Sequence, residues 1–408
     1  MSELSYLEKL LDGAEVEWKS LSELASLRRG RVMSKGYFVD NIGEYPVYSS
    51  QTANSGMIGS IDTFDFDGEF VSWTTDGANA GTVFYRKGKF SITNVCGLIK
   101  INDNSPLNYK YLFYWLSIEA KSHVYSGMGN PKLMSHQVEK IPVPIPCPNN
   151  PEKSLAIQSE IVRILDKFTA LTAELTAELT AELTARKKQY NYYRDQLLSF
   201  EEGAAPFYPL GQKEVGEFIR GGSFQKKDFT KSGIGCIHYG QIFTHYGTYA
   251  NKTKTFVSES LAQKCRKAKT GNLVIATTSE NDDDVCKAVA WLGTEDIAVS
   301  SDACIYRHNL NPKYVSYFFQ TESFQSQKRQ YITGTKVRRV NADNLAKILI
   351  PVPSQEEQTR IVDILDKFDL LTSSISQGLP REIELRQKQY EYYRDLLFSF
   401  PKPDSVTN

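Results

Sequence analysis

Two sets of basic, amide and hydroxyl side chains stand in or beside turns and could bind phosphates or the edges of nucleic-acid bases. Arginine and lysine pair with phosphate oxygens, and arginine and asparagine form paired hydrogen bonds with guanine and adenine. Solvated surface is the plain alternative for each residue alone, but the recurrence of such turns in both halves favours binding. The first set is Arg28, Arg29, Arg31, Lys35, Thr74, Thr75, Asn130 and Lys132, and the second is Arg220, Lys226, Lys227, Thr277, Thr278, Lys336, Arg338 and Arg339.

Catalytic motifs are not found in the sequence. It has no phosphate-binding loop and no dinucleotide-binding glycine motif. The turn Asn130-Pro131-Lys132 lacks the second proline and the aromatic residue of an amino-methyltransferase motif. The run Asp282-Asp283-Asp284 could hold a metal, but no downstream carboxylate matches it, and a solvated loop is favoured. The five histidines show no catalytic or metal-ligand spacing. We therefore expect no catalytic residue, no metal site and no cofactor in this chain.

An internal repeat organises the elements that must position the two sets. The run Gln158–Phe168 returns as Gln358–Phe368, and the run Arg186–Phe200 returns as Arg386–Phe400. Both offsets are 200 residues, so the stretch between the runs has one length in each copy. Each copy therefore consists of a head followed by a long helix.

The heads match only faintly, through short segments. Alternating apolar runs and one helical stretch in each, around 108–121 and 311–328, predict an α+β head. The matched positions are Leu24, Leu27, Arg29 and Gly30 with Val215, Phe218, Arg220 and Gly221; Val71–Thr75 with Val274–Thr278; Tyr111, Tyr114 and Trp115 with Tyr314, Tyr317 and Phe318; and Ile141–Pro146 with Ile348–Pro353.

Apolar residues three and four apart place one stripe on each long helix. The first helix is expected from about 155 to 200 without a capping box, and the second opens at Ser354-Gln-Glu-Glu357 with one. Gly378-Leu-Pro380 is expected to break or kink the second. The stripes predict an antiparallel coiled coil separating two globular domains, with pseudo-two-fold symmetry. The expected parts are an N-terminal helix at 1–17 that closes the ring near the C-terminus, heads at 18–150 and 206–353, and helices at 151–205 and 354–408.

A tetrapeptide, Thr-Ala-Glu-Leu, occurs three times in a row from Thr172 to Leu183. One interpretation is an ordinary amphipathic helix. The other is a ruler, in which each unit adds about 6 Å and about 40° of rotation along a periodic ligand such as duplex DNA. Both interpretations remain open.

The segments that end the long helices also carry residues off the apolar stripe. Tyr192 and Arg194 recur as Tyr392 and Arg394. Aromatic and arginine side chains are typical anchors of protein interfaces. Their duplication predicts two copies of one partner.

The net charge is zero, but residues 206–352 carry an excess of seven positive charges, which permits DNA binding without demonstrating it. The six cysteines show no zinc spacing, and no apolar stretch has the length of a signal or a membrane span. These features predict a cytoplasmic protein with reduced thiols.

Over nearly its whole length the chain resembles the specificity subunits of type I restriction–modification enzymes. The resemblance lies in the two unlike heads, the repeated Gln-x-x-Ile-Val-x-x-Leu-Asp and Gln-Tyr-x-Tyr-Tyr-Arg-Asp segments, and the Thr-Ala-Glu-Leu units, which are similar to those of the IC subfamily. It implies that each head recognises one half of an interrupted, asymmetric double-stranded DNA sequence. It also implies two methyltransferase subunits that use S-adenosylmethionine, and two restriction subunits that use ATP and Mg. A protein-binding scaffold with two heads, or an enzyme with an unrecognised site, is the competing hypothesis.

Overall fold

Each of the two units of the structure combines one head with parts of both long helical regions. The computed structural model describes residues 6–127, 129–373 and 378–401. Two predicted apolar positions lie outside them: Leu4, on one face of the expected N-terminal helix, and Ile375, in the stripe of the second long helix. Unit 1 is Met1–Leu175 with Leu385–Asn408, and unit 2 is Thr176–Glu384. The fold is α+β, as predicted.

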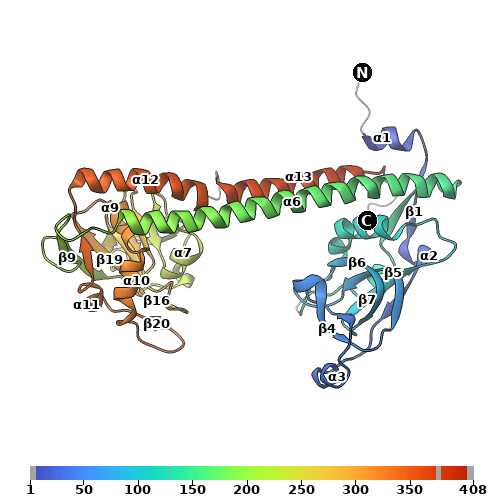
Figure 1. Cartoon of the computed structure of the whole chain (residues 1–408), viewed down its shortest axis with the longest axis horizontal. Helices are drawn as coiled ribbons and strands as arrows, with labels where there is room; N and C mark the ends of the chain where they lie inside the picture. Colours follow the sequence, from blue (N-terminus) through green and yellow to red (C-terminus); the bar gives the residue numbers. More distant parts are fainter. Residues whose placement is uncertain (1–5, 128, 374–377, 402–408) are drawn as a thin grey trace. The chain divides into compact units, whose positions relative to one another are not determined.

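Head 1 is built on a six-stranded sheet in the order β2-β7-β5-β6-β3-β4 (Figure 1). Neighbouring strands are antiparallel, except that β3 and β6 are parallel. The sheet strands are β2 (Ala25–Arg29), β3 (Tyr45–Tyr48), β4 (Met57–Ile61), β5 (Phe66–Thr74), β6 (Val83–Ile92) and β7 (Cys96–Ile101). A separate pair, β1 (Val16–Ser20) with β8 (Pro142–Pro146), joins the two ends of the head. The helices of this part are α1 (Tyr6–Leu11), α2 (Leu21–Leu24), α3 (Lys35–Asp40), η1 (Ala53–Gly56), α4 (Tyr109–Glu119), η2 (Ala120–His123) and α5 (Ser135–Val138).

Head 2 has a five-stranded sheet, β10-β19-β15-β17-β12, a four-stranded sheet, β13-β11-β18-β14, and the pairs β16-β20 and β21-β9. Its strands are β9 (Phe207–Pro209), β10 (Gly216–Arg220), β11 (Ile234–Ile237), β12 (Tyr249–Ala250), β13 (Thr255–Val257), β14 (Lys267–Ala268), β15 (Leu273–Ala276), β16 (Thr278–Ser279), β17 (Ala288–Trp291), β18 (Ile297–Val299), β19 (Ala303–His308), β20 (Arg338–Arg339) and β21 (Leu349–Pro351). Its helices are η3 (Lys226–Asp228), α7 (Tyr239–Thr244), α8 (Glu259–Ala262), α9 (Pro312–Phe318), α10 (Glu322–Arg329) and α11 (Ala342–Leu345).

Strand pairing corrects one of the predicted matches between the heads. Thr75 donates its backbone N–H and its hydroxyl to the Val95 carbonyl, and Thr277 donates the same two groups to the Asp302 carbonyl. Thr75 therefore corresponds to Thr277, whereas the sequence match had paired it with Thr278. One residue of slip reverses which face of a strand each side chain occupies, so Asp76, and not Thr75, is the counterpart of Thr278.

The long helices are α6 (Pro151–Leu197), α12 (Gln355–Ser373) and α13 (Leu379–Leu397). The first begins four residues earlier than expected because Asn150 caps it, accepting the Lys153 N–H at 3.0 Å, and proline is tolerated at the first helical position. The predicted interruption near Gly378 is confirmed, since α12 and α13 are separate helices. A Cβ on Gly378 would lie 2.6 Å from the Leu371 carbonyl oxygen, so this approach requires glycine.

Each head is attached to the start of its long helix by the same polar contacts. In unit 1, Asp166 on α6 accepts from Lys110 at 2.6 Å and from the Tyr114 hydroxyl at 2.7 Å. In unit 2, Asp366 on α12 accepts from Lys313 and the Tyr317 hydroxyl at the same two distances. The repeated glutamines contribute equally: Gln158 accepts the Asn108 N–H at 2.9 Å, and Gln358 accepts the Asn311 N–H at 2.8 Å.

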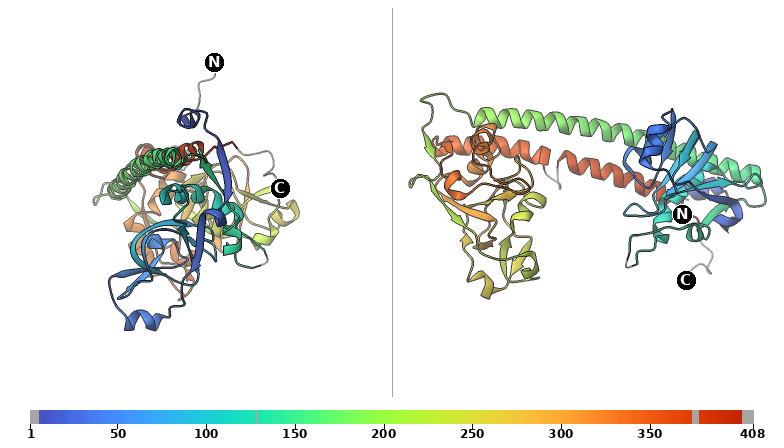
Figure 2. Two further views of the ribbon diagram at one scale, coloured as in Figure 1. Left: turned by 90° about the vertical axis from the view of Figure 1, so that its right-hand side faces the viewer. Right: turned by 90° about the horizontal axis from the view of Figure 1, so that it is seen from below.

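The paired helices of each unit also repeat their aromatic contacts. The ring of Phe168 stacks on Tyr393 in unit 1 with centroids 5.5 Å apart, and Phe368 stacks on Tyr193 in unit 2 at 5.6 Å. Figure 1 and the right-hand view of Figure 2 show α12 beside the C-terminal half of α6. Within each unit the paired segments run in opposite directions, as predicted.

The apolar cores join the heads to these helices. In unit 1, Leu7 and Leu11 of α1 share one cluster with Leu397, Phe398 and Phe400, so the two ends of the described chain meet in one core. In unit 2, Tyr190 and Leu198 belong to the core of head 2. Among the helices that the structure describes, none has the length and apolar character to cross a bilayer.

The attachment of head 2 can be tested at Asp366. Replacing Asp366 by alanine leaves the Lys313 ammonium and the Tyr317 hydroxyl without their acceptor, so we expect the free energy of unfolding to fall by about 2 kcal/mol. Urea unfolding of the full chain, followed by fluorescence, measures the change, and Trp291 is the tryptophan of head 2. Asp363→Ala, at an exposed position one helical turn earlier, is the matched control. Equal stability of the two variants would contradict the role of Asp366.

Candidate nucleic-acid interface

Head 2 contains an open cavity that gathers four residues of the second predicted set. Its volume is about 470 Å³. Arg220 is the last residue of β10, and Arg339 is the last residue of β20. Thr277 lies between β15 and β16, and Thr278 is the first residue of β16. The remaining lining residues are Ser301, Asp302, Ala303, Cys304, Tyr331, Thr333, Val340, Asn341, Ala342 and Asn344.

Backbone pairing holds the walls of this cavity. Arg220 is paired with Cys304 across β10 and β19, and Thr278 is paired with Arg339 across β16 and β20. The Arg220 and Arg339 side chains are exposed. The Thr278 side chain is 6% exposed, and its hydroxyl oxygen has no hydrogen-bond partner among the described residues. The cavity therefore presents two guanidinium groups on a rigid frame of strands.

The turn that carries Arg339 depends on a glycine and an ion pair. Thr333 and Arg339 exchange backbone hydrogen bonds of 2.9 Å, which closes the turn. Gly334 has φ of 90°, and a Cβ there would lie 2.1 Å from the Val337 carbonyl oxygen. Arg338 pairs with Asp282 at 2.8 Å and also donates to the Gly334 carbonyl. Lys336, at the exposed tip, does not line the cavity.

Lys226 and Lys227 lie outside the cavity. They form part of η3 and are exposed, and Asp228 accepts the Gln225 N–H at 2.7 Å to cap this short helix. The structure therefore brings Arg220, Thr277, Thr278 and Arg339 together but places Lys226, Lys227, Lys336 and Arg338 outside the cavity lining.

In head 1, strand β2 carries Arg28 and Arg29 as exposed side chains. Arg29 lies at the position of Arg220, because Arg29 pairs with Gly97 as Arg220 pairs with Cys304. Its guanidinium donates to the Asn94 carbonyl at 3.4 Å. Lys35, the first residue of α3, is also exposed.

Arg31 has a structural role. It pairs with Asp65 at 3.1 Å and donates to the Tyr37 hydroxyl at 3.0 Å, with its guanidinium over the Tyr37 ring. The hydrogen bond with Tyr37 is the largest contribution that raises the pKa of Arg31, ahead of the contribution of Asp65. The residue thus ties the turn after β2 to α3.

The other members of the first set divide into exposed and buried residues. Asn130 and Lys132 are exposed, and the Lys132 ammonium lies 3.9 Å from an Asp76 carboxylate oxygen. Thr74 and Thr75 are fully buried, and both hydroxyls donate to backbone carbonyls. Neither threonine presents its hydroxyl to solvent, so in this structure they support the turn from inside.

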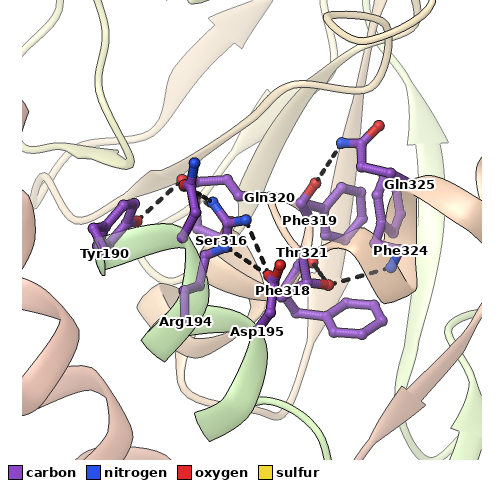
Figure 3. A network of polar contacts seen from close by, with 11 residues as sticks. Tyr190, Arg194, Asp195, Ser316, Phe318, Phe319, Gln320, Thr321, Phe324 and Gln325 are labelled. Carbon is purple, nitrogen blue, oxygen red and sulfur yellow. Dashed lines mark hydrogen bonds and ion pairs between the residues drawn. The ribbon is translucent and has the colours of Figure 1, made fainter. Parts of the chain in front are cut away.

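The predicted partner-binding residues also divide. Tyr192 and Tyr392 are exposed by 62% and 64%. The expectation that Arg194 is exposed is wrong, since its exposed fraction is 8%. Figure 3 shows the reason: the Arg194 guanidinium binds Asp195, next to Tyr190, whose hydroxyl donates to Gln320 at 3.2 Å. Arg394 makes the same contact with Asp395 but remains half-buried.

Sequence reasoning missed three polar residues that shape the units, namely Asp166, Asp366 and Lys328. Asp166 and Asp366 lie inside the repeated motif, and a matching Asn-x-Lys-Tyr-x-x-Tyr pattern starts α4 and α9, which was the available signal. Lys328 is fully buried, although it stands in a polar helix, and no local pattern indicates this. Among the described residues, no group of three or more His, Cys, Asp or Glu side chains is placed to hold a metal ion, and this includes Asp282–Asp284.

Known proteins share both the sequence and the fold. Residues 14–185 and 210–385 match the family model of the type I restriction modification DNA specificity domain. The chain is 41% identical over 421 aligned residues to the EcoR124I/EcoR124II type I restriction enzyme specificity subunit of Escherichia coli, with all of both chains covered. It is 33% identical to a putative type I restriction enzyme specificity subunit of Haemophilus influenzae, covering 97% of this chain and 98% of the relative.

A solved structure also shares the fold. A chain from a study of complex assembly and conformational transition of the type I R-M system aligns with a TM-score of 0.62 at 14% identity, covering 94% of this chain and 97% of that chain. The two copies of the family domain correspond to the two head-and-helix repeats. This chain therefore belongs to the family of type I restriction–modification DNA specificity subunits.

Proposed function

We propose that this chain gives a type I restriction–modification enzyme its DNA sequence specificity, with each head recognising one half of an asymmetric, bipartite site. The observation that carries the proposal is the cavity of head 2, which Arg220 on β10 and Arg339 on β20 line together from two different sheets. Family membership supports the same role.

The chemistry of the cavity suits a nucleic acid. Guanidinium groups can pair with guanine edges or with phosphates. The carboxylate of Asp302 adds an acceptor for other base edges, and the side-chain NH2 groups of Asn341 and Asn344 add donors, since their oxygens accept from the Asn344 N–H and from Lys347. Exposed Lys226, Lys227 and Lys336 can add contacts to the DNA backbone without reading its sequence. The excess of seven positive charges in residues 206–352 favours the same ligand.

Head 1 offers a different surface for the other half of the site. Within the first predicted set, the exposed residues that form no structural ion pair with Asp65 are Arg28, Arg29, Lys35, Asn130 and Lys132, whereas exposed Arg31 is held by Asp65 and Tyr37. Of these five residues, Arg29 and Lys132 occupy the positions of cavity residues in head 2, namely Arg220 and Arg339. The two heads share corresponding strand pairs but expose different side chains. This difference favours recognition of two different half-sites.

The helices carry the proposed contacts with partner proteins. Apolar side chains that remain exposed recur 200 residues apart, as Leu171 with Leu371 and Tyr192 with Tyr392. Such duplicated aromatic and apolar positions suit two copies of one methyltransferase subunit. Two restriction subunits would complete the enzyme. In this proposal the partners supply S-adenosylmethionine, ATP and Mg chemistry, and this chain is non-catalytic. The free cysteines agree with a cytoplasmic location.

Selection of random-sequence duplexes by the chain in complex with a methyltransferase partner tests the function. We expect an interrupted consensus with two constant halves. Exchanging residues 206–352 for another head is expected to change one half only. No consensus at all would support a protein-binding scaffold instead, and a change in both halves would contradict independent heads.

Arg339→Ala provides a residue-level prediction. We expect a loss of about 1–3 kcal/mol of binding to the cognate duplex and relaxed selection at one position of a single half-site. Competition binding with duplexes that vary each position measures it. Lys252→Ala, an exposed lysine of the same head outside the cavity, is the control and is expected to leave base selection unchanged. If the variant instead bound all duplexes more weakly by the same factor, Arg339 would contact a phosphate and not a base, and the prediction would be wrong.

Deleting Thr180–Leu183 tests the ruler. The Thr-Ala-Glu-Leu units lie inside α6, and Thr180 and Thr184 donate to carbonyls four residues earlier, so the helix can lose one unit without losing its internal bonds. We expect a shorter spacer and unchanged half-sites, because about 6 Å of helix is removed. Thr180→Ala, which keeps the length, is expected to keep the spacer. Selection of random duplexes measures both, and an unchanged spacer in the deletion variant would contradict the ruler.

A further inference from the structure

Lys328 is a buried cation that no part of the proposed DNA surface uses directly. Its exposed fraction is 0%, and it lies on α10, away from the cavity lining. Its ammonium donates to the carbonyl oxygens of Asp282 at 2.8 Å, Asp283 at 3.2 Å and Val285 at 2.9 Å, and to the Gln325 side chain. Burial lowers the pKa of Lys328. Burying an ammonium is costly unless its hydrogen bonds are satisfied, and here carbonyl oxygens of one loop satisfy them.

The loop bound to Lys328 turns its carbonyls inward and its carboxylates outward. Residues Asp282, Asp283 and Asp284 are exposed, although the carbonyls of the first two bind the buried ammonium. Asn281 ties the loop to itself, since its side chain exchanges hydrogen bonds of 2.7 and 2.8 Å with Asp284. The loop therefore holds the Asp284 carboxylate against Asn281, while the Asp283 carboxylate projects from an exposed residue.

The Asp282 carboxylate connects this loop to the turn that carries the recognition cations. It pairs with Arg338 at 2.8 Å, and Arg338 donates to the Gly334 carbonyl of the turn. Arg338 is also paired with Ser279 in the backbone, next to the pair of Arg339 with Thr278. A continuous set of contacts therefore runs from the ammonium of Lys328 to the turn that presents Arg339.

We infer that Lys328 is a positioning residue for the half-site that head 2 recognises. Its ammonium orients the loop 282–285, which holds Asp282 against Arg338 and thereby fixes the turn 333–339. The inference rests on the proposed function, because the turn matters only if Arg339 contacts DNA. Head 1 uses a shorter arrangement: Asp76, in the position of Thr278, pairs directly with Lys132, in the position of Arg339.

Asp282→Asn separates positioning from folding. The Asp282 side chain is 52% exposed and that of Arg338 is 33% exposed, so the loss of this ion pair should change stability little. We expect discrimination between cognate and substituted half-site 2 to fall about tenfold, because Arg339 no longer has one fixed direction. Discrimination at half-site 1 and affinity for non-specific duplex should be unchanged. Asp282→Glu, which keeps the carboxylate, is expected to retain most of the discrimination.

Lys328→Met tests whether the buried ammonium is needed to hold Asp282 against Arg338. We expect the same selective loss at half-site 2, and the double variant Lys328→Met with Asp282→Asn should lose no more than Lys328→Met alone, because both act through one set of contacts. Asp283→Asn, in the same loop and exposed, is the matched control and should behave as the unchanged chain. All variants are measured as full chains in complex with the methyltransferase partner, against duplexes substituted in one half-site at a time.

The outcomes are separable. Full discrimination at half-site 2 in folded Asp282→Asn would overturn the inference, as would additive losses in the double variant. If Lys328→Met does not fold, Asp282→Asn and Asp282→Glu still decide it. Failure of the unchanged chain to prefer any sequence would overturn the proposed function itself and would be seen before any variant is compared.

Discussion

One carboxylate on each long helix determines how the rest of each unit can be built. Asp166 accepts from a lysine and a tyrosine on α4 of head 1, and Asp366 accepts from a lysine and a tyrosine on α9 of head 2, at the same pair of distances. A charged acceptor with two donors has one favourable geometry, so it fixes the head helix on the long helix. The residues that make this contact are constrained in both copies, whereas the outer turns of the heads are not. The contrast explains why the helices repeat closely while the heads differ.

The sequence was sufficient for features that depend on local order. Apolar spacing and the 200-residue offset predicted the long helices, Gly378-Leu-Pro380 predicted the interruption of the second one, and alternating apolar runs with one helical stretch predicted the α+β heads. The sequence was insufficient where residues distant in the chain determine strand register or the burial of a side chain. The match of Val71–Thr75 to Val274–Thr278 was one residue out of register, because hydrogen bonds to Val95 and Asp302 fix the register and cannot be read from either strand. Arg194 was expected outside, but Asp195 on the same helix and the nearby core side chain of Tyr190 accommodate it.

The candidate site shows the same division. Residue types and their recurrence were enough to select Arg220 and Arg339, which the structure brings to one cavity from strands far apart in the chain. Residue types alone could not distinguish Arg220 and Arg339 from Thr74 and Thr75, whose hydroxyls donate to backbone carbonyls inside the head. They also could not select Lys328, because its burial depends on a loop more than 40 residues away. Side chains that read a ligand resemble surface residues in sequence, and so do the residues that position them.

The two heads support corresponding turns by different means, and this difference bears on how specificity can change. In head 1 the supporting ion pair includes Lys132 itself, so a substitution there alters support and surface together. In head 2 the support lies one residue away, at Arg338, and is anchored by a buried ammonium. Among the described residues, Arg339 forms no ion pair, and the Thr278 hydroxyl beside it has no hydrogen-bond partner. Substitutions at Arg339 can therefore change what head 2 recognises without loosening the turn that presents it.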